Sequence, residues 1–401
     1  MRSRPPALGS RRVLMLDENV SVPFDRRVWQ EALALREAGY EVVVVSPKGI
    51  GRDDHAYEVR DKVEIHRFSL RPAVGGVVDY AREYAAALWS MRRMVGRLTA
   101  DRSFSVVHAA NPPDFLLTVA RPLARRGTRL IFDHHDLTPE LYESRFGRQG
   151  IQYRMLLAAE RRAFASADIV ITTNESYRRV ALARGGKRSD DVFIVRNGPD
   201  PDRFRPVEAD ESLRRGRPYL IAYLGLMGPQ DGLDVAIRAL ARLHADRTDW
   251  HAVFMGDGDV LEDTRRLAHD LGISDSVEFT GRVGDDRILP TLSTADVCIS
   301  PEPWSPFNDR STIVKVVEYM AMARAVVAFD LTETRISAQD AALYAPSGDE
   351  TAFARAISTL LDDADLRRTL GDRGLDRVVR GLGWHRSREE LLRAYASLDA
   401  R

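Results

Sequence analysis

Short apolar runs of four to seven residues recur along the chain and alternate with longer stretches of helical periodicity. The first series of runs covers 13–16, 41–46, 63–68, 106–110, 129–134, 169–173 and 192–196. A second series covers 219–225, 251–256, 277–281, 297–300, 325–330 and 342–346. Because runs that are apolar at nearly every position are buried on both faces, they predict parallel sheets covered by helices. We therefore expect an α/β fold with two doubly wound domains.

A polar segment with four prolines, residues 197–218, separates the two series and is typical of a linker. We expect a first domain over residues 1–205, a second over 206–383, and an amphipathic helix over 384–401. Doubly wound sheets bind ligands beyond the C-terminal ends of their strands. With two such sheets, the cleft between the domains is the expected binding site.

Composition indicates a globular chain in a reducing compartment. Apolar residues make up 44% of the 401 positions, enough for sizeable cores. No apolar run approaches the roughly 18 residues that span a bilayer. The basic segment 1–12 precedes only four apolar residues, so we expect no signal peptide. Cys298 is the only cysteine, which excludes an internal disulfide. We expect a cytoplasmic protein.

Charge is balanced overall but divided unevenly along the chain. Residues 1–205 hold 35 Lys and Arg against 26 Asp and Glu, a difference of +9, and the remainder carries −9. A basic half favours an anionic membrane surface or substrate, and ordinary solvated charge is the alternative. The basic stretch 145–164 fits either peripheral contact with the inner face of a membrane or a helix packed on the sheet. We expect no nucleic acid partner.

The segment 308–321, "NDRSTIVKVVEYMA", combines an apolar helical face with charged residues in its first turns. Ser311 or Thr312 is expected to cap the helix, whose N-terminal end then attracts an anion such as phosphate. Lys315 adds a cation, and Glu318 can accept the two hydroxyls of a ribose. The alternative is an ordinary i,i+3 surface pair.

Glycines follow two strands of the second series. Gly225 and Gly228 lie in "GLMGPQDG" and Gly256 in "MGDGD". Such glycines let the backbone approach a phosphate, but plain tight turns explain them equally well.

In the first series, "DHHD" at 133–136 ends a strand. His134, His135 and Asp136 suit acid–base chemistry, metal binding or local hydrogen bonds. Metal-ligand spacing is absent, so no metal site is expected. Arg26 and Arg27 open a helix, where they can meet a phosphate or a carboxylate, or serve at the surface.

Taken in order, several segments resemble glycosyltransferase family 4, whose members have the GT-B fold of two Rossmann-like domains facing each other across a cleft. The segments are "RRVWQEALALREAGYEVVVVSP", "DHHDLTPELY", "RNGPDPDRFRP", "FMGDGD", "VEFTGRV" and "KVVEYMAMARAVVAFD". The resemblance covers nearly the whole chain. It implies that the second domain binds the nucleotide sugar and the first the acceptor, with helix 384–401 packed back onto the first domain.

The resemblance assigns roles to residues of the second domain. Glu318 matches the glutamate that binds the ribose. Arg310 stands where the family has a glutamate that contacts the donor sugar, and the neighbouring Asp309 offers a carboxylate instead. Segment 225–232 lacks the family's two cations, so we expect Lys315 and Arg310, with Arg26 or Arg27, to offset the diphosphate.

Other implied contacts lie on loops of both domains. Arg282 and Val283 match the loop that contacts the base, and Glu333 lies in the loop near the sugar. His135 matches the histidine beside the transferred sugar. Asp136 is expected to orient it, with His134 as an equally placed competitor.

The resemblance implies a metal-independent hexosyltransferase that acts with retention in polysaccharide or glycoconjugate biosynthesis. The expected donor is a UDP-sugar, with a GDP-sugar as the second choice, and no cofactor is expected. The expected acceptor is a hydroxyl compound, with a lipid-linked hydroxyl as one option. The alternatives are a nucleotide-sugar epimerase or hydrolase of the same fold, or a non-catalytic nucleotide-sugar-binding scaffold.

Overall fold

The computed structural model describes residues 11–49, 51–70, 77–147 and 149–399, so most of the basic segment 1–12 and position 148 of the stretch 145–164 lie outside it. The chain divides into two compact units. The first contains the residues up to Val195 together with those from Arg388 onward, and the second runs from Arg196 to Ser387. Each unit is described by itself.

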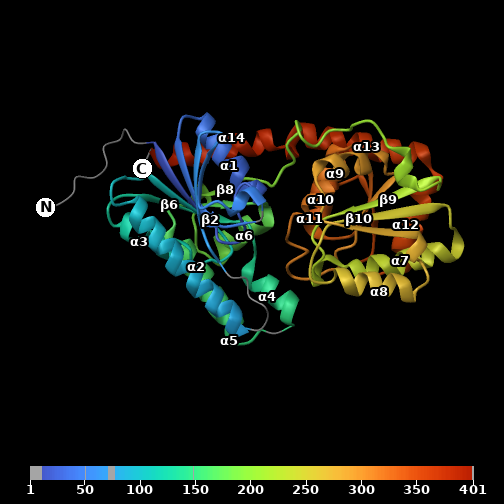
Figure 1. Cartoon of the computed structure of the whole chain (residues 1–401), viewed down its shortest axis with the longest axis horizontal. Coiled ribbons are helices and arrows are strands. Elements are labelled where there is room, and N and C mark those ends of the chain that lie inside the picture. Colours follow the sequence, from blue (N-terminus) through green and yellow to red (C-terminus); the bar gives the residue numbers. More distant parts are fainter. Residues whose placement is uncertain (1–10, 50, 71–76, 148, 400–401) are drawn as a thin grey trace. The chain divides into compact units, whose positions relative to one another are not determined.

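The first unit is built on an eight-stranded sheet with the order β3-β4-β2-β1-β5-β6-β7-β8 (Figure 1). Its strands are β1 (Arg12–Leu16), β2 (Glu41–Pro47), β3 (Tyr57–Arg60), β4 (Val63–Phe68), β5 (Val106–Ala110), β6 (Arg129–His134), β7 (Ile169–Thr172) and β8 (Val192–Ile194). Neighbouring strands are parallel, except that β3 is antiparallel to β4. Parallel pairing brings the C-terminal ends of β1, β5 and β6 to one edge.

Helices connect the strands of the first unit: α1 (Arg26–Glu37), α2 (Val77–Leu98), α3 (Leu117–Ala124), α4 (Thr138–Phe146), α5 (Ile151–Ser166) and α6 (Glu175–Ala183). α1 begins where the Asp25 side chain accepts a hydrogen bond from the Val28 amide. Alternate residues of β1 and β2, such as Leu14 and Val43, share an apolar cluster with α2, α3 and α5. The sheet is therefore buried on that face, as the continuous apolar runs predict.

The second unit holds a six-stranded sheet, all parallel, with the order β11-β10-β9-β12-β13-β14. Its strands are β9 (Tyr219–Leu224), β10 (Trp250–Met255), β11 (Val277–Gly281), β12 (Val297–Ser300), β13 (Ala325–Phe329) and β14 (Ala342–Ala345). Its helices are α7 (Leu233–Asp246), α8 (Leu261–Asp270), α9 (Asp285–Thr294), α10 (Val314–Ala321), α11 (Thr332–Ala338), α12 (Glu350–Asp362) and α13 (Ala364–Arg377). Two apolar clusters, one against each face of this sheet, form the core.

The expected α/β architecture is confirmed, because each predicted strand corresponds to an observed one. The structure adds β3, which the apolar pattern missed because this edge strand is largely exposed. The boundary between the units follows Val195, whereas we expected it after residue 205. Residues just beyond Val195 pack within the second unit. Phe204 is buried in one of its apolar clusters, and the Pro199 carbonyl accepts a hydrogen bond from the Trp384 amide (3.1 Å).

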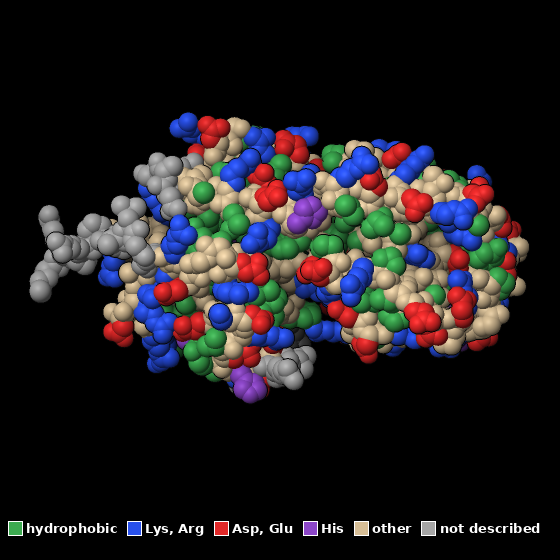
Figure 2. Space-filling model, turned by 90° about the horizontal axis from the view of Figure 1, so that it is seen from above, with side chains coloured by type: hydrophobic (Ala, Val, Ile, Leu, Met, Phe, Trp, Pro, Cys, Tyr) green, Lys and Arg blue, Asp and Glu red, His purple; other side chains and the backbone are tan. Residues whose placement is uncertain are grey.

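Helix α14 (Trp384–Asp399) begins in the second unit, and its residues from Arg388 onward are counted with the first. The hydroxyl of its buried Tyr395 forms a hydrogen bond with His108 Nδ1 (2.9 Å). Among the described residues, no helix combines the length and apolar character that a bilayer crossing requires. On the face drawn in Figure 2, acidic and basic side chains are interspersed on each unit.

Candidate functional site

Two loops pack tightly at the C-terminal edge of the second sheet. The Gly225 amide donates to the Met255 carbonyl (3.0 Å), and the Met227 amide donates to the Asp257 carbonyl (3.0 Å). A Cβ on Gly256 would lie 1.8 Å from the Gly225 carbonyl oxygen, and one on Gly225 would lie 2.6 Å from Lys315 Cε. On Gly228 the same position is filled by the Gln230 side chain. Protein atoms therefore occupy the space that these glycines leave.

Helix α10 starts later than the sequence predicts. Its N-cap position is Ile313, and no side chain caps it. The Ser311 hydroxyl instead donates to the Phe307 carbonyl (2.7 Å), and Thr312 lies one residue before the cap. The expectation that Ser311 or Thr312 caps this helix is therefore wrong, because the turn at 305–311 ends before the helix begins.

Lys315 is buried at the start of α10, in the midst of three polar groups. Its ammonium forms an ion pair with Glu302, lies 3.5 Å from Asp231 Oδ1, and donates to the Tyr223 hydroxyl at 3.0 Å. The same ammonium lies 4.5 Å from the centre of the Tyr223 ring, within range of a cation–π contact. Burial opposes the charge, but Glu302, Tyr223 and Asp231 raise the pKa of Lys315 well above its ordinary value. The site thus holds a fixed cation with two carboxylates around it.

Glu318 follows Lys315 at i+3 and is also buried. The nearby Arg203 interacts electrostatically with it. Arg203 Nε donates to Asp285 Oδ2 at 2.6 Å, and its guanidinium lies 4.6 Å from the centre of the Phe204 ring. Burial opposes the charge of Arg203, but these carboxylates raise its pKa above the ordinary value. Sequence reasoning missed Arg203 because it lies in the linker-like segment.

The other residues expected on the donor side follow β11, β12 and β13, at the same end of the second sheet. Asp309 accepts from the Thr332 amide (2.9 Å) and hydroxyl (3.0 Å), which fixes the first turn of α11. Glu333, the next residue in α11, is fully buried, whereas Arg310 is exposed. After β11, Arg282 is exposed and Val283 packs against an apolar cluster. Asp309 therefore has a structural partner of its own.

In the first unit, the two histidines at the end of β6 have different surroundings. His134 is fully buried, with Nε2 3.1 Å from Glu160 Oε1 and its ring edge-on to Phe164. His135 has Nδ1 at 3.3 Å from Asp133 Oδ2. The structure therefore places only His135 beside Asp133, at the edge of the sheet.

Asn111, at the C-terminal end of β5, fixes the backbone around His135. Its Oδ1 accepts from the amides of His135 (2.8 Å) and Asp136 (3.0 Å). Burial raises the pKa of Asp136, and His135 opposes this shift. The residue that contacts the His135 ring is Asp133, whereas the sequence pointed to Asp136. Asp133 lies two positions before His135, and side chains two positions apart along a strand point to the same face.

Arg27 is engaged inside the first unit. Its guanidinium makes a two-pronged pair with Asp133, with both N–O distances 2.7 Å, and donates to the Val195 carbonyl at 2.9 Å. Burial opposes the charge, but Asp133 and Glu31 raise the pKa of Arg27 further above its ordinary value. Its neighbour Arg26 is exposed. Arg27 thus faces the interior, and Arg26 is the arginine of this pair on the surface.

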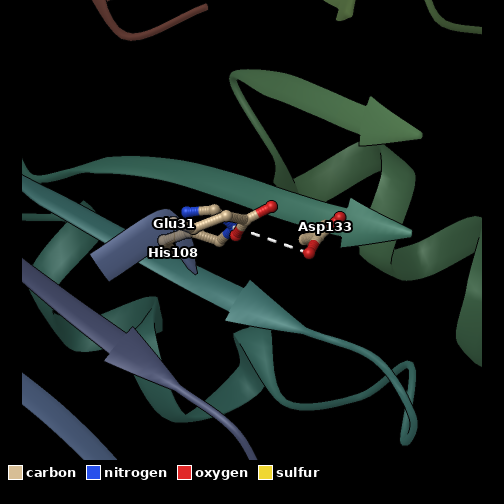
Figure 3. A group of neighbouring side chains, drawn as sticks. All are labelled: Glu31, His108 and Asp133. Atoms are coloured by element: carbon tan, nitrogen blue, oxygen red, sulfur yellow. Dashed lines mark ion pairs between the residues drawn. The ribbon is translucent and has the colours of Figure 1, made fainter. Parts of the chain in front are cut away.

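Glu31 and His108 extend this network behind Asp133, as Figure 3 shows. His108 Nε2 lies 3.5 Å from Glu31 Oε2 and 3.9 Å from Asp133 Oδ2. Burial, together with Asp133, raises the pKa of Glu31 to about 7, against the opposing effect of Arg27. The three side chains are close enough for metal ligation, with ligand atoms within 4.8 Å of one another. However, the Arg27 guanidinium, 3.2 Å from Glu31 Oε1, already supplies a positive charge there.

Two doubly wound sheets, parallel apart from β3, are the arrangement of the GT-B fold. Sucrose-phosphate synthase from Thermosynechococcus elongatus superposes with a TM-score of 0.80 at 19% identity, covering 97% of this chain and 99% of that one. The family described as "Glycosyl transferases group 1" matches residues 218–363, and the "Glycosyl transferase 4-like domain" matches residues 25–198. The chain belongs to the group 1 glycosyltransferases, family 4.

Two curated relatives are mycobacterial. A "GDP-mannose-dependent alpha-(1-6)-phosphatidylinositol monomannoside mannosyltransferase" of Mycobacterium tuberculosis is 34% identical over 138 residues. That match spans 33% of this chain and 36% of the relative, about a third of its length. The "Phosphatidyl-myo-inositol mannosyltransferase" of Mycolicibacterium smegmatis is 28% identical over 380 residues, which cover 93% of this chain and 89% of the relative.

Proposed function

We propose that this chain transfers a sugar from a nucleoside-diphosphate sugar to a hydroxyl acceptor, with retention at the anomeric carbon. The observation that carries the proposal is the placement of buried Lys315 and Glu318 on α10, at the C-terminal edge of the second sheet. Open α/β sheets bind nucleotides at this edge. The second unit is therefore the donor-binding unit and the first the acceptor-binding unit.

Lys315 is the proposed cation for the diphosphate. As the glycosidic bond breaks, negative charge grows on the leaving diphosphate, and a fixed cation aimed at it stabilises the transition state. Glu302 and Asp231 hold the ammonium in place, so little reorganisation accompanies binding. Arg310, exposed on the preceding loop, adds a second charge.

Glu318 is the proposed ligand of the ribose hydroxyls, because a carboxylate accepts two hydrogen bonds at once. Arg282 and Val283 are proposed to contact the base; Asp285, the partner of Arg203, follows them closely in sequence. Asp309 is proposed to face the sugar, and the fully buried Glu333, whose amide donates to the Asp309 carbonyl, to support it from α11. His135, with Asp136 beside it, belongs to the first unit and is proposed to lie against the transferred sugar.

The names of the two mycobacterial relatives make GDP-mannose the first donor to test, with UDP-glucose as the uridine counterpart. The experiment incubates the protein with each donor, with and without phosphatidylinositol as acceptor. Mass spectrometry detects the products, and NMR of the anomeric proton reports the stereochemistry. We expect product only when the acceptor is present, with the donor's α configuration retained and no requirement for a divalent metal.

Other outcomes of this experiment identify other functions. Product from the donor alone indicates an epimerase or a hydrolase of the same fold. Donor binding without product, with either donor and with or without the acceptor, indicates a scaffold that keeps the fold without turnover. Inverted product overturns the proposed stereochemistry.

A lipid acceptor implies work at a membrane surface, and α5 offers a face for it. Ile151 and Met155 on this helix have exposed fractions of 71% and 66%, and Arg154 and Arg162 are exposed beside them. Such a mixture of apolar and basic side chains binds anionic lipid surfaces. We therefore propose peripheral contact with the inner face of the membrane.

Co-sedimentation with phosphatidylglycerol vesicles at low and high salt tests this contact. Binding is expected to weaken in the double variant Ile151→Ser/Met155→Ser and at high salt. Leu226→Ser, at an equally exposed leucine of the second unit (72%), is the control. Equal binding of both variants and the unaltered protein would reject α5 as the contact face.

A further inference from the structure

A buried ion pair stands directly behind His135. Asp133, with no exposed surface, receives two hydrogen bonds from Arg27 through separate oxygens. One of these oxygens, Oδ2, also lies 3.3 Å from His135 Nδ1. Arg27 is in turn anchored on the Val195 carbonyl. The carboxylate has therefore little freedom to rotate, and the imidazole that contacts it is fixed in orientation.

We propose that Asp133, clamped by Arg27, is a positioning residue that holds His135 in its doubly protonated form. His135 then acts as a hydrogen-bond donor and a positive charge toward the substrate, and not as a base. The catalytic meaning of this assignment rests on the proposed function, whereas the protonation state itself does not.

The geometry supports a proton on Nδ1, because a carboxylate at this nitrogen accepts a hydrogen bond only from its protonated form. The second nitrogen, Nε2, lies on the opposite side of the same ring. A proton on both nitrogens is favoured by the surrounding charge. The charged groups that face or surround His135 come from the loop after β1 (Asp17), the start of α1 (Asp25, Arg27, Glu31) and the end of β6 (Asp133, Asp136).

The balance of these groups favours the cation. Burial lowers the pKa of His135, but the hydrogen bond and charge of Asp133, helped by Asp136, raise it to about 9 against the opposing charge of Arg27. The pKa of Asp133 is held well below its ordinary value: burial opposes ionisation, and Arg27 more than compensates. At neutral pH the arrangement is thus an aspartate between two cations.

An imidazolium of this kind suits a reaction in which negative charge develops. It can donate a hydrogen bond to a sugar hydroxyl or a phosphate oxygen without releasing its proton. Its side chain is 11% exposed. A base at this position would require the neutral ring, which the contact with Asp133 disfavours.

The first test measures His135 in the unaltered, ligand-free protein. Exchange of the imidazole C2 hydrogen with deuterium, followed by mass spectrometry over pH 5 to 10, reports the pKa of each histidine. We expect a midpoint near 9 for the peptide containing His135. A midpoint near 6.5, the ordinary value for histidine, would overturn the proposal, and this result does not depend on any variant folding.

The second test uses Asp133→Asn, with Glu140→Gln as the matched control. Glu140 is another buried carboxylate of the first unit, paired with Arg184 at 2.8 Å. In Asp133→Asn we expect the His135 midpoint to fall by about 2 pH units, whereas in Glu140→Gln it should stay unchanged even if stability falls. An unchanged midpoint in both variants would contradict the proposal.

The pH profile of kcat/KM supplies the catalytic readout. Activity of the unaltered protein should decline as pH rises through about 9, and in Asp133→Asn the decline should move toward 6.5, with activity partly recovered in acid. A variant equally impaired at every pH would show that Asp133 is only structural. If no transfer is detected with any donor, the proposed function fails, and the histidine titration still decides the protonation state.

Discussion

Replacing Lys315 with methionine removes a positive charge from the proposed donor site while keeping most of the side chain's volume. Lys315 and Glu302 have side-chain exposures of only 9% and 3%. Removing one partner of a buried ion pair leaves the other charge uncompensated, which costs about 3–5 kcal/mol of stability. The loss should grow with pH: Lys315 offsets the effect of burial on Asp231, whose pKa is already raised. Without Lys315 the pKa of Asp231 rises further. The folded protein then favours protonated Asp231, and its free energy of unfolding falls as pH increases.

Donor affinity should fall as well. A hydrogen bond to a charged group contributes about 1.5–3 kcal/mol, so Lys315→Met should weaken binding of a nucleoside diphosphate by roughly 10- to 150-fold. Titration calorimetry with GDP and UDP measures this affinity, and amide hydrogen exchange over β9, β10 and α10 measures local stability at pH 5 and pH 8.

Two further variants separate stability from binding. Glu302→Gln keeps the ammonium and should bind the nucleotide at least as tightly as the unaltered protein. The double variant Lys315→Met/Glu302→Gln removes both charges together and should regain much of the stability lost in Lys315→Met, but not its affinity. If the double variant recovers affinity, or if Lys315→Met binds as tightly as the unaltered protein, Lys315 does not hold the diphosphate.

Other consequences can be tested separately. Burial raises the pKa of Asp114 to about 7, so its contribution to stability is lost as pH rises from about 4 to 7; Asp114→Asn should remove this loss, up to about 4 kcal/mol, as measured by urea unfolding at pH 4.5 and 8. Gly256→Ala would place a Cβ 1.8 Å from the Gly225 carbonyl oxygen and should destabilise the second unit by about 3 kcal/mol or more. Gly272→Ala, at a positive φ with open space around it, should lose only the free energy of placing an alanine in a left-handed conformation, about 1–2 kcal/mol. Equal shifts of the melting temperature for the two variants would contradict the steric explanation.

The sequence predicted the architecture well because burial on both faces leaves a local signature. Each apolar run is a strand, and no long-range information is needed to see it. β3 escaped because its residues are largely exposed, and its pairing with β4 is the only feature that defines it as a strand. The start of α10 was misplaced because the turn around Ser311 offers polar side chains that bond within the turn instead.

Candidate residues were easier to find than their partners. Lys315 and Glu318 are visible as a local i,i+3 pair, but Asp231 lies 84 positions from Lys315. Likewise, Arg27 and Asp133 are 106 positions apart, and only the parallel register of the sheet brings them together. Because the strand ends meet at one edge of the sheet, the sequence identifies candidate site residues. Which of their side chains form pairs depends on long-range packing that a local sequence pattern does not reveal.

The hydrogen bond between His108 and Tyr395 spans 287 positions of sequence, which bears on how the chain folds as it is synthesised. At about 5–20 residues per second, Tyr395 leaves the ribosome roughly 15 to 60 seconds after His108. The whole of the second unit, Arg196–Ser387, is made in that interval. The unit that is started first is thus finished last. Until α14 is synthesised, the charged cluster of Glu31, His108 and Asp133 lacks its contact with Tyr395. The first unit can therefore be completed only after the second unit has been synthesised.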